Sequence, residues 1–293
     1  MTVRSFKLGI LGGPSVGKYS LSPVMHQAAF AFLKSRGRQV EGIYQPHAVK
    51  PEDLPRWLQE MAPRLDGFNV TMPYKETVFA WVKTKGRLGR PDLDGEIGAV
   101  NTVVMEEGCP IGYNTDGEGF LRALTDPPRS MEPKGWRCLL LGAGGSAQAI
   151  AFYLASAGAG RITLWNRHVD RAGRLAERIR RCFSGRCDVK TLANLETASL
   201  EETDLLVNAT PVGMEGLPEL LVRVERLPKK AVVYDIVYSP PRTPLLLAAE
   251  KQGNPTVNGL EMLAQQGAAA FHLWVGNETP VLGAVRESLG LAA

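Results

Sequence analysis

Short apolar runs that end in glycine, proline or polar turns recur along the first part of this chain. Four of them are typical of strands: Leu8–Leu11, Glu41–Pro46, Gly67–Val70 and Gly98–Met105. Helix-forming stretches separate these runs, and Pro23 suits the first turn of a helix that continues to about Lys34. Strands that alternate with helices predict an α/β fold.

A glycine-rich turn follows another apolar run, Cys138–Leu141, which is typical of a buried parallel strand. The turn has the form Gly142-x-Gly144-x-x-Ala147 and leads into an alanine-rich helical stretch. The first glycine permits a tight turn, the second lets the backbone approach a pyrophosphate, and the small third residue lets the helix pack closely. The free amides at the helix start would face the phosphates. This pattern predicts a dinucleotide-binding unit, although a tight strand-to-helix turn without a ligand has the same local sequence.

The next predicted strand, Arg161–Trp165, indicates which dinucleotide is bound. NAD-binding units place an acidic residue at this strand end for the ribose 2′-hydroxyl, whereas an arginine accommodates a 2′-phosphate. Here the strand ends in Asn166 and Arg167, and Arg171 follows one turn later. A guanidinium suits a phosphate better than a hydroxyl, so we expect NADP. The alternative is that both arginines are solvated charges at the start of a helix.

Alternating elements continue to the end of the chain. The predicted elements are a strand at Asp204–Val207, a strand at Val232–Tyr238, and helices at Val169–Arg181, Pro244–Lys251, Met262–Val275 and Val281–Leu289. The loop Asn208–Met214 follows a strand, and we expect it to lie over the dinucleotide. The last two helices have no sheet of their own, so we expect them to pack back on the first domain.

The length of 293 residues suggests two domains, because a domain usually has about 100–200 residues. We expect a substrate-binding catalytic domain at residues 1–116 plus 260–293 and a dinucleotide-binding domain at residues 117–259. A hydrophobic fraction of 44% is ordinary for a globular protein. No apolar run reaches the about 20 residues that a membrane-spanning helix needs, and the first residues lack the apolar core of a signal peptide. We therefore expect a cytoplasmic protein without a membrane partner.

Cysteine spacing and net charge give no indication of other ligands. The four cysteines, Cys109, Cys138, Cys182 and Cys187, lack the paired spacing of a metal site, so we expect free thiols and no metal. The net charge of +4 is mild and the lysines and arginines are scattered, so we expect no nucleic-acid partner.

The first glycine-rich loop, Gly12–Ser20, resembles a phosphate-binding loop because it contains Gly-x4-Gly-Lys. Tyr19 stands after the lysine where such a loop needs serine or threonine for magnesium, which argues against a nucleoside triphosphate site. Ser20 and Ser22 precede the first helix, so their hydroxyls lie beside free helix amides and could hold a substrate carboxylate. The alternative is that Ser22 is an ordinary N-cap.

Polar residues follow several predicted strands of the first domain. Asn69, Thr71 and Lys75 lie around the C-terminal end of the predicted strand Gly67–Val70, where ligands bind in open α/β sheets. Asn101 lies within another predicted strand, and Asp116 follows the strand after that. These residues indicate a polar pocket that contains one lysine. The alternatives are that Lys75 is a solvated surface charge and that Asp116 is a helix N-cap.

Nine motifs in this order resemble those of the shikimate dehydrogenase family, and the resemblance covers nearly the whole chain. The motifs are Ser20-Leu-Ser22-Pro-Val-Met-His26, Asn69-Val-Thr71-Met-Pro73-Tyr-Lys75, Gly98-Ala-Val-Asn101-Thr102, Tyr113-Asn-Thr-Asp116-Gly117, Gly142-Ala-Gly-Gly-Ser146, Asn166-Arg167, Asn208-Ala-Thr210-Pro-Val-Gly213, Asp235-Ile-Val-Tyr238 and Gly259-Leu-Glu-Met-Leu-Ala-Gln-Gln266. The resemblance implies an N-terminal α/β substrate domain, completed by the C-terminal helices, and a Rossmann-type NADP-binding domain. It places the active site in the cleft between them.

The resemblance also implies the role of each matching residue. The implied catalytic pair is Lys75 and Asp116. The implied substrate ligands are Ser20, Ser22, Asn69, Thr71, Lys75, Asn101, Asp116, Tyr238 and Gln266. The implied NADP contacts are Gly142, Ala143, Gly144, Gly145, Ser146, Asn166, Arg167, Arg171, Thr210, Ile236 and Gly259.

The implied activity is reversible NADP-dependent hydride transfer between shikimate and 3-dehydroshikimate, in the pathway to chorismate and aromatic amino acids. Quinate or aminoshikimate dehydrogenase is an alternative, because such enzymes share most of these motifs and would differ near Ser20. The chain has Tyr19 where a histidine is common in the family and His168 where threonine or serine is common. A ligand-sensing homologue without catalysis is a further alternative, although a sensor needs no Lys75–Asp116 pair. We expect a small-molecule substrate and a monomer or homodimer.

Overall fold

The computed structural model describes residues 3–276 and 278–292. The chain forms two compact units. Unit 1 contains residues 1–119 and 263–293, and unit 2 contains residues 120–262. The chain passes between them within two helices, α6 (Asp116–Thr125) and α10 (Gly259–Val275). The boundaries expected from the sequence, after residues 116 and 259, lie at the starts of these helices.

Unit 1 is built on a mixed six-stranded sheet with the order β2-β1-β3-β5-β6-β4. Its strands are β1 (Arg4–Gly12), β2 (Val40–Ala48), β3 (Gly67–Val70), β4 (Arg87–Leu88), β5 (Thr102–Glu106) and β6 (Cys109–Tyr113). Its helices, besides the parts of α6 and α10, are α1 (Val16–Tyr19), α2 (Ser22–Ser35), α3 (Leu54–Glu60), α4 (Lys75–Lys85), α5 (Pro91–Ile97) and α11 (Leu282–Ser288). Strands β1, β2 and β3 are parallel, whereas β5 is antiparallel to β3 and to β6.

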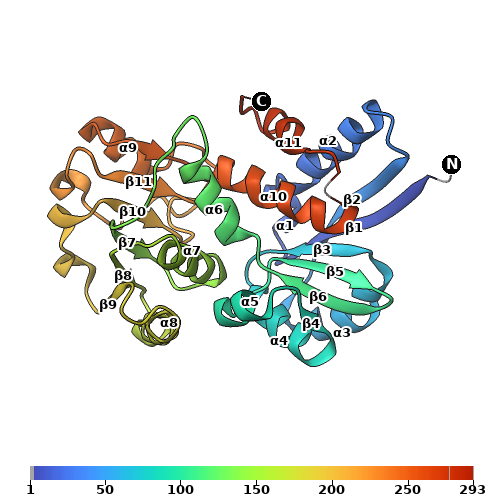
Figure 1. Ribbon diagram of the computed structural model, residues 1–293, viewed down its shortest axis with the longest axis horizontal. Coiled ribbons are helices and arrows are strands. Elements are labelled where there is room, and N and C mark those ends of the chain that lie inside the picture. Colours follow the sequence, from blue (N-terminus) through green and yellow to red (C-terminus); the bar gives the residue numbers. More distant parts are fainter. Residues whose placement is uncertain (1–2, 277, 293) are drawn as a thin grey trace. The chain divides into compact units, whose positions relative to one another are not determined.

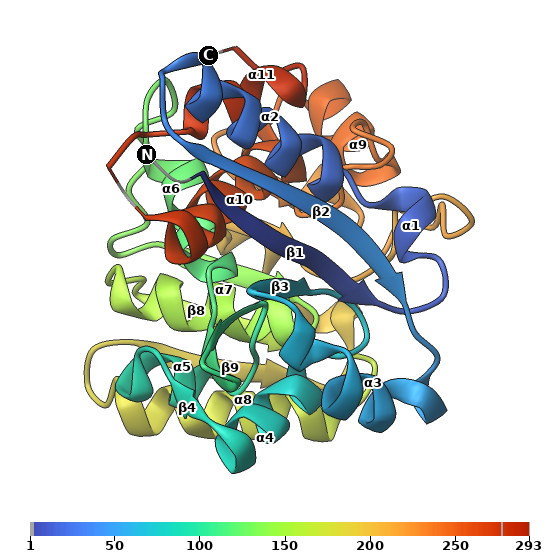
Figure 2. The ribbon, with the colours of Figure 1, turned by 90° about the vertical axis from the view of Figure 1, so that its right-hand side faces the viewer.

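Helices cover both faces of the unit 1 sheet (Figures 1 and 2). On one face, apolar side chains of β1 such as Leu8 pack in one buried cluster with those of α2, α10 and α11. On the other face, Phe68 and Val70 of β3 pack with apolar side chains of α3 and α4. The alternation of β1, in which Phe6, Leu8 and Ile10 share one cluster, explains how one strand supports that layer. The expectation that the C-terminal helices pack on the first domain is confirmed.

Unit 2 is built on a parallel sheet with the order β12-β11-β10-β7-β8-β9. Its strands are β7 (Arg137–Leu141), β8 (Arg161–Trp165), β9 (Asp188–Leu192), β10 (Leu205–Asn208), β11 (Val232–Asp235) and β12 (Thr256–Val257). Its complete helices are α7 (Gly145–Ser156), α8 (Val169–Cys182) and α9 (Pro244–Gln252). Strands β7 to β9 extend the sheet in one direction and β10 to β12 extend it in the other. The switch between β7 and β10 is where an open α/β sheet binds its ligand. The predicted α/β class with a Rossmann-type second domain is confirmed.

Two local predictions differ from the structure, which also contains a helix that was not predicted. The strand expected at Gly98–Met105 begins only at Thr102, because helix α5 precedes it and ends at Gly98 in the left-handed conformation (φ +72°). Helix α5 itself was not expected. The strand expected at Val232–Tyr238 ends at Asp235, whose side chain accepts the backbone N–H of Val237 and so turns the chain.

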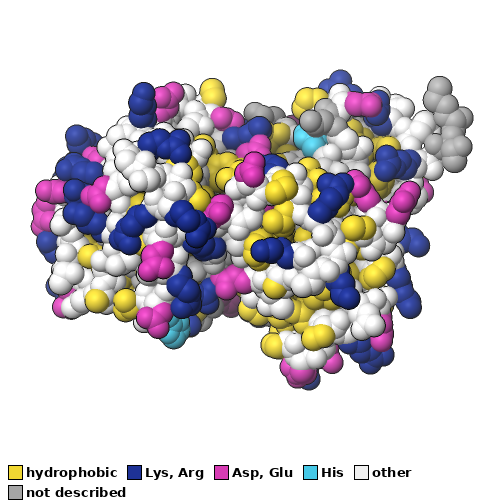
Figure 3. Space-filling view, turned by 60° about the horizontal axis from the view of Figure 1, so that its bottom comes forward, with side chains coloured by type: hydrophobic (Ala, Val, Ile, Leu, Met, Phe, Trp, Pro, Cys, Tyr) yellow, Lys and Arg dark blue, Asp and Glu magenta, His cyan; other side chains and the backbone are white. Residues whose placement is uncertain are grey.

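The molecular surface mixes charges of both signs. Lysine and arginine side chains are interspersed with aspartate and glutamate on the face shown in Figure 3. Among residues 3–276 and 278–292, no helix is long and apolar enough to cross a membrane. Within the same residues, no group of three or more His, Cys, Asp or Glu side chains is placed to hold a metal ion.

Candidate active site

Three loops of unit 1 meet at one edge of its sheet because strand direction alternates there. Asn69 of β3 lies opposite Thr102 of β5, and Thr102 lies opposite Tyr113 of β6. The end of β3, the start of β5 and the end of β6 therefore share this edge. Each is flanked by polar residues, so strand pairing brings together segments that lie far apart in the sequence.

Lys75 and Asp116 form an ion pair in unit 1. Each is the first residue of its helix, α4 for the lysine and α6 for the aspartate. The distance from Lys75 Nζ to Asp116 Oδ2 is 2.5 Å. The exposed fractions are 13% for the lysine side chain and 6% for the aspartate side chain, so little water screens the pair. An ammonium group held by a carboxylate can hold a substrate hydroxyl and exchange a proton with it.

Asn101 connects this pair to other predicted substrate ligands. Its amide nitrogen lies 2.7 Å from Asp116 Oδ1 and 3.3 Å from Gln266 Oε1. Its side-chain oxygen accepts the backbone N–H of Thr115 at 2.8 Å. Asn101 is buried, with 2% of its surface exposed. The structure therefore joins Lys75, Asp116, Asn101 and Gln266 in one hydrogen-bonded cluster.

The side chain of Asn69 is surrounded by protein partners. Its oxygen accepts the hydroxyl of Tyr44 at 2.7 Å and lies 3.2 Å from His26 Nε2. Its amide nitrogen donates to the carbonyl of Asn101 and to Thr102 Oγ1. These contacts occupy the two donors and two acceptors of an asparagine amide. Direct contact with a substrate, as the sequence predicts, would require one of these bonds to be exchanged.

His26 stays neutral beneath this amide. Complete burial lowers the pKa of His26 to about 3, against the smaller opposing effect of the hydrogen bond between His26 Nε2 and the accepting Asn69 side-chain oxygen. Its ring stacks on Tyr44 with 4.3 Å between centroids, and no partner of its Nδ1 is present among the described residues. A neutral ring is the form that a buried site without a carboxylate partner favours.

Ser20 and Ser22 lie at the start of α2. Ser20 Oγ accepts the backbone N–H of Ser22 at 3.3 Å. Ser22 is the first residue of α2, so the N-cap is Leu21 rather than Ser22, and no side-chain hydrogen bond caps the helix there. His26 is one turn further along α2 and contacts Asn69, so this helix start faces the end of β3. Thr71 follows β3 and donates its backbone N–H to the carbonyl of Leu11.

The glycine turn of unit 2 has the form that the sequence predicts. Gly142 follows β7 with φ +114°, and a Cβ there would lie 2.8 Å from the carbonyl oxygen of Ala209. Gly144 precedes α7, and a Cβ on it would meet no atom within 4 Å. Ala143, Gly145 and Ser146 complete the turn and open the helix. The open space at Gly144 lies beside free helix amides, which fits a pyrophosphate.

The loop after β10 lies against the glycine turn, as the contact of Gly142 with Ala209 shows. Asn208 fixes this loop by accepting the backbone N–H and hydroxyl of Thr210 and by donating to Asp235 Oδ1. Burial raises the pKa of Asp235 to about 6, although hydrogen bonds from Thr243, Val237 and Asn208 oppose this shift. The predicted contacts Gly142 and Thr210 therefore meet at the switch of the unit 2 sheet.

The remaining predicted NADP contacts surround the same sheet edge. Asn166 follows β8 and donates to the carbonyl of His168, and Arg167 beside it is exposed. Arg171 of α8 reaches back to the glycine turn, with Nη2 3.4 Å from the carbonyl oxygen of Ala143. Gly259 begins α10, and any Cβ there would overlap the carbonyl of Ile236.

The predicted substrate ligand Tyr238 belongs to unit 2 and follows β11. The other predicted substrate ligands belong to unit 1.

Three family models match this chain. Residues 11–103 match the shikimate dehydrogenase substrate binding domain, residues 129–238 match shikimate/quinate 5-dehydrogenase, and residues 259–289 match the shikimate 5′-dehydrogenase C-terminal domain. The shikimate dehydrogenase (NADP(+)) of Methanopyrus kandleri is 44% identical over 280 residues, which cover 94% of this chain and 91% of the relative. The chain belongs to the shikimate dehydrogenase family. The resemblance inferred from the nine motifs is confirmed.

Two solved structures show how far the family fold extends. The shikimate 5-dehydrogenase of Thermus thermophilus, in complex with NADP(H) and shikimate, is 38% identical with a TM-score of 0.80 over 97% of this chain and 98% of that one. The quinate dehydrogenase of Corynebacterium glutamicum, in complex with NAD, is 30% identical with a TM-score of 0.81 over 97% of this chain and 98% of that one. Similar folds therefore occur in family relatives with different substrates and cofactors.

Sequence reasoning missed several side chains that hold the unit 1 cluster together. The missed residues are Tyr44, Arg90 and Asp94. Asp94 follows Arg90 by four residues, a spacing that would pair the two only in a helix, and the sequence predicted no helix there. Nothing in the local sequence indicated that this carboxylate would be fully buried or that it would contact the strand end near Asp116.

Proposed function

We propose that this chain catalyses the reversible NADP-dependent oxidation of shikimate to 3-dehydroshikimate. The observation that supports this most directly is the largely buried Lys75–Asp116 ion pair, joined through Asn101 to Gln266. The chain also belongs to a family whose relatives are named shikimate dehydrogenase (NADP(+)), which supports the same reaction. A non-catalytic sensor would need no such proton-exchanging pair.

Lys75 moves the proton in this proposal. As the substrate hydroxyl carbon loses its hydride to the cofactor, the hydroxyl oxygen becomes a carbonyl oxygen and releases its proton to the uncharged amine form of Lys75, which becomes the ammonium. In the reverse direction the Lys75 ammonium group gives the proton to the oxygen that gains negative charge. Asp116 orients the lysine and holds the same hydroxyl. General acid–base catalysis of this kind contributes about 10²–10⁴-fold to the rate.

The other proposed ligands fix the substrate ring. Ser20 and Ser22, at the start of α2, would bind the carboxylate of shikimate beside free helix amides. Thr71, Asn101, Gln266 and Tyr238 would bind the carboxylate or ring hydroxyls. Holding the reacting carbon in place contributes about 7–11 kcal/mol to lowering the barrier.

The cofactor residues fit NADP. When bound, NADP supplies the hydride acceptor at its nicotinamide ring. A Cβ on Gly144 would meet no atom within 4 Å, which supports approach of the pyrophosphate there, and Arg167 and Arg171 would bind the 2′-phosphate. Thr210, Ile236 and Gly259 would line the nicotinamide end. We also propose that the protein acts in the cytoplasm, in the route to chorismate, as a monomer or homodimer.

A spectrophotometric assay tests this function. Purified protein is mixed with NADP and either shikimate or quinate, and the absorbance of NADPH is followed in parallel. We expect rapid NADPH formation with shikimate and little with quinate. Faster formation with quinate would move the assignment to quinate dehydrogenase, whose fold this chain shares. Binding of shikimate without turnover of either compound would favour the sensor.

A further inference from the structure

A second ion pair lies behind the candidate catalytic pair. Helix α5 places Arg90 just before its first turn and Asp94 within it. The Asp94 side chain has 0% of its surface exposed, and the Arg90 side chain 35%. Burial raises the pKa of Asp94, and the guanidinium of Arg90 and hydrogen bonds from both backbone and side chain oppose the shift. A carboxylate this deeply buried must be paired or hydrogen-bonded, and the groups that bind Asp94 indicate which part of the chain it holds in place.

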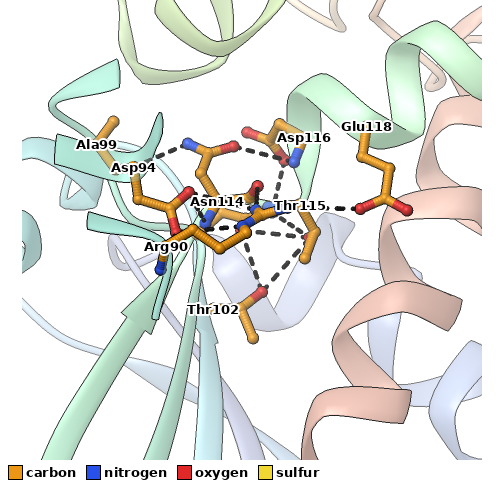
Figure 4. Close-up of polar contacts among 9 residues, drawn as sticks. Arg90, Asp94, Ala99, Thr102, Asn114, Thr115, Asp116 and Glu118 are labelled. Carbon is orange, nitrogen blue, oxygen red and sulfur yellow. Dashed lines mark hydrogen bonds and ion pairs between the residues drawn. The ribbon is translucent and has the colours of Figure 1, made fainter. Parts of the chain in front are cut away.

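Both side chains bind the backbone of Asn114 (Figure 4). Asp94 Oδ1 accepts the N–H of Asn114 at 3.2 Å, and Arg90 Nη2 donates to its carbonyl oxygen at 2.5 Å. Arg90 Nε and Nη2 lie 3.3 Å from the two Asp94 oxygens, so the guanidinium and the carboxylate support each other. The Arg90–Asp94 ion pair therefore fixes the peptide groups on both sides of Asn114.

Asn114 in turn fixes the backbone of Asp116. Its side-chain oxygen accepts the N–H of Asp116 at 3.0 Å, and its side-chain nitrogen donates to the carbonyl of Ala99 at 2.9 Å. Arg90 also reaches α6 directly, with Nη1 3.7 Å from Glu118 Oε2. The start of α6, where Asp116 lies, is thus tied to α5 at two points.

We propose that the Arg90–Asp94 ion pair is a positioning device that holds Asp116 in the geometry it needs to orient Lys75. The inference rests on the proposed function, since it assigns Asp116 a part in the reaction. Both residues act on Asp116 through Asn114, whose backbone they bind and whose side chain accepts the Asp116 N–H. Misplacement of a reacting group by about 1 Å costs about 100-fold in rate. A buried ion pair adds little net stability compared with apolar packing, which makes a geometric role the better account of this one.

The decisive experiment is a double-mutant cycle of Asp94→Ala and Asp116→Ala. We measure kcat and KM for shikimate with saturating NADP, using high enzyme concentrations where turnover is slow. If Asp94 acts through Asp116, Asp94→Ala lowers kcat about tenfold or more in the otherwise unchanged protein, but less than about twofold when Asp116 is already alanine. We also expect kcat to change more than KM. Equal factors in both backgrounds would overturn the proposal.

Conservative variants extend the test to cases in which Asp94→Ala folds poorly. Asp94→Asn keeps an oxygen that can accept the Asn114 N–H, so its kcat should lie between those of the unchanged protein and Asp94→Ala. Arg90→Lys keeps the positive charge but cannot bind Asp94 and the Asn114 carbonyl with one planar group, so we expect kcat to fall about threefold to tenfold. Unchanged kcat in both folded variants would also overturn the proposal.

Two controls separate positioning from stability. Arg87 and Glu106 form an exposed ion pair in the same unit, so Glu106→Ala should leave kcat unchanged. Leu58→Ala removes a buried side chain from the core of unit 1 and lowers the melting temperature without touching the loop of Asn114. If Leu58→Ala reduces kcat as much as Asp94→Ala does at the same assay temperature, the effect is one of stability and the positioning role fails.

The same data distinguish failure of this inference from failure of the proposed function. Normal turnover in Lys75→Ala and Asp116→Ala would reject the catalytic pair itself, and with it a role for Asp94 in positioning that pair. Strongly reduced turnover in both, together with additive effects of Asp94→Ala, would reject only the positioning device.

Discussion

The candidate substrate region of unit 1 is formed mainly by side chains, whereas the candidate cofactor region of unit 2 is formed mainly by the backbone. In unit 1, side chains from three loops form a network of amides, hydroxyls and one ion pair around Asn101 and Asp116. In unit 2, backbone geometry dominates, with the glycine turn closed against the loop of Ala209. A chemical step needs ionisable groups at set distances, whereas a pyrophosphate needs open space and free amides.

Each unit also contains a buried titratable side chain whose pKa is shifted by burial. His26 in unit 1 is neutral near pH 7 because burial lowers its pKa to about 3. Asp235 in unit 2 has a pKa raised to about 6 by burial. Each supports an asparagine that orders a loop, Asn69 in one unit and Asn208 in the other. Burial therefore acts in opposite directions on the two pKa values and favours the uncharged form in both.

The largest expected effect concerns the side-chain chemistry of unit 1. Lys75→Ala should lower kcat by about 10²–10⁴-fold with a smaller change in KM, because it removes the proton-exchanging group. The measurement is steady-state oxidation of shikimate with NADP. Exposed Lys83 of the same helix provides the control, since Lys83→Ala should retain normal turnover. Near-normal turnover in Lys75→Ala would reject the assignment.

The next effect concerns the buried carboxylate of unit 2. Because the pKa of Asp235 rises from 3.8 to about 6 on folding, the folded state binds more protons than the unfolded state between these values. The free energy of unfolding contributed by this group is therefore highest below about pH 4 and falls by up to ~3 kcal/mol as the pH rises through about 6.

Asp235→Asn should remove this dependence, because the amide is similar in shape and does not titrate. The check is urea unfolding of both proteins from pH 4 to pH 7, since the contribution of His26 cancels in the difference. Parallel curves for the two proteins would contradict the raised pKa.

A pair of glycines tests whether backbone geometry builds the cofactor region. Gly142→Ala should lower the free energy of unfolding by about 1–3 kcal/mol, because φ of +114° and the nearby carbonyl disfavour a side chain. Gly144→Ala meets no atom and should change that free energy by less than about 1 kcal/mol, yet it should weaken NADP binding about tenfold or more.

Urea unfolding and calorimetric titration with NADP measure the two effects. Gly173→Ala, in the open on α8, is the control and should leave NADP binding unchanged. Unchanged NADP affinity in Gly144→Ala would show that the pyrophosphate does not approach this turn.

The smallest expected effect concerns Arg167, a side chain in the candidate cofactor region of unit 2. We expect NADP to bind at least about tenfold more tightly than NAD, and Arg167→Ala should reduce that preference by about tenfold, or ~1.4 kcal/mol. Titration of each protein with both cofactors measures the preference. Arg174→Ala, exposed on α8, should keep it. Equal affinity of the unchanged protein for NADP and NAD would reject the role of Arg167.

The sequence alone determined the fold class, the family and the glycine turn. These features rest on local patterns: apolar runs of strand length, glycines where the backbone must turn tightly, and short motifs in a fixed order. The turn at Gly142 was predictable because its backbone angle is a local property. The extra helix α5 was missed, because its short stretch carries no clear apolar periodicity and ends in a glycine within an expected strand.

Only the tertiary structure decided which polar groups meet. The antiparallel pairing of β5 with β3 and β6 brings Asn69, Asn101 and Asp116 to one edge, and that pairing depends on contacts distant in sequence. Packing also buries the Asp94 carboxylate against Asn114 and pairs it with Arg90, which no local pattern indicated. Burial and hydrogen-bond geometry are set by the whole unit, which is why the sequence could suggest single polar residues but not the network of hydrogen bonds around them.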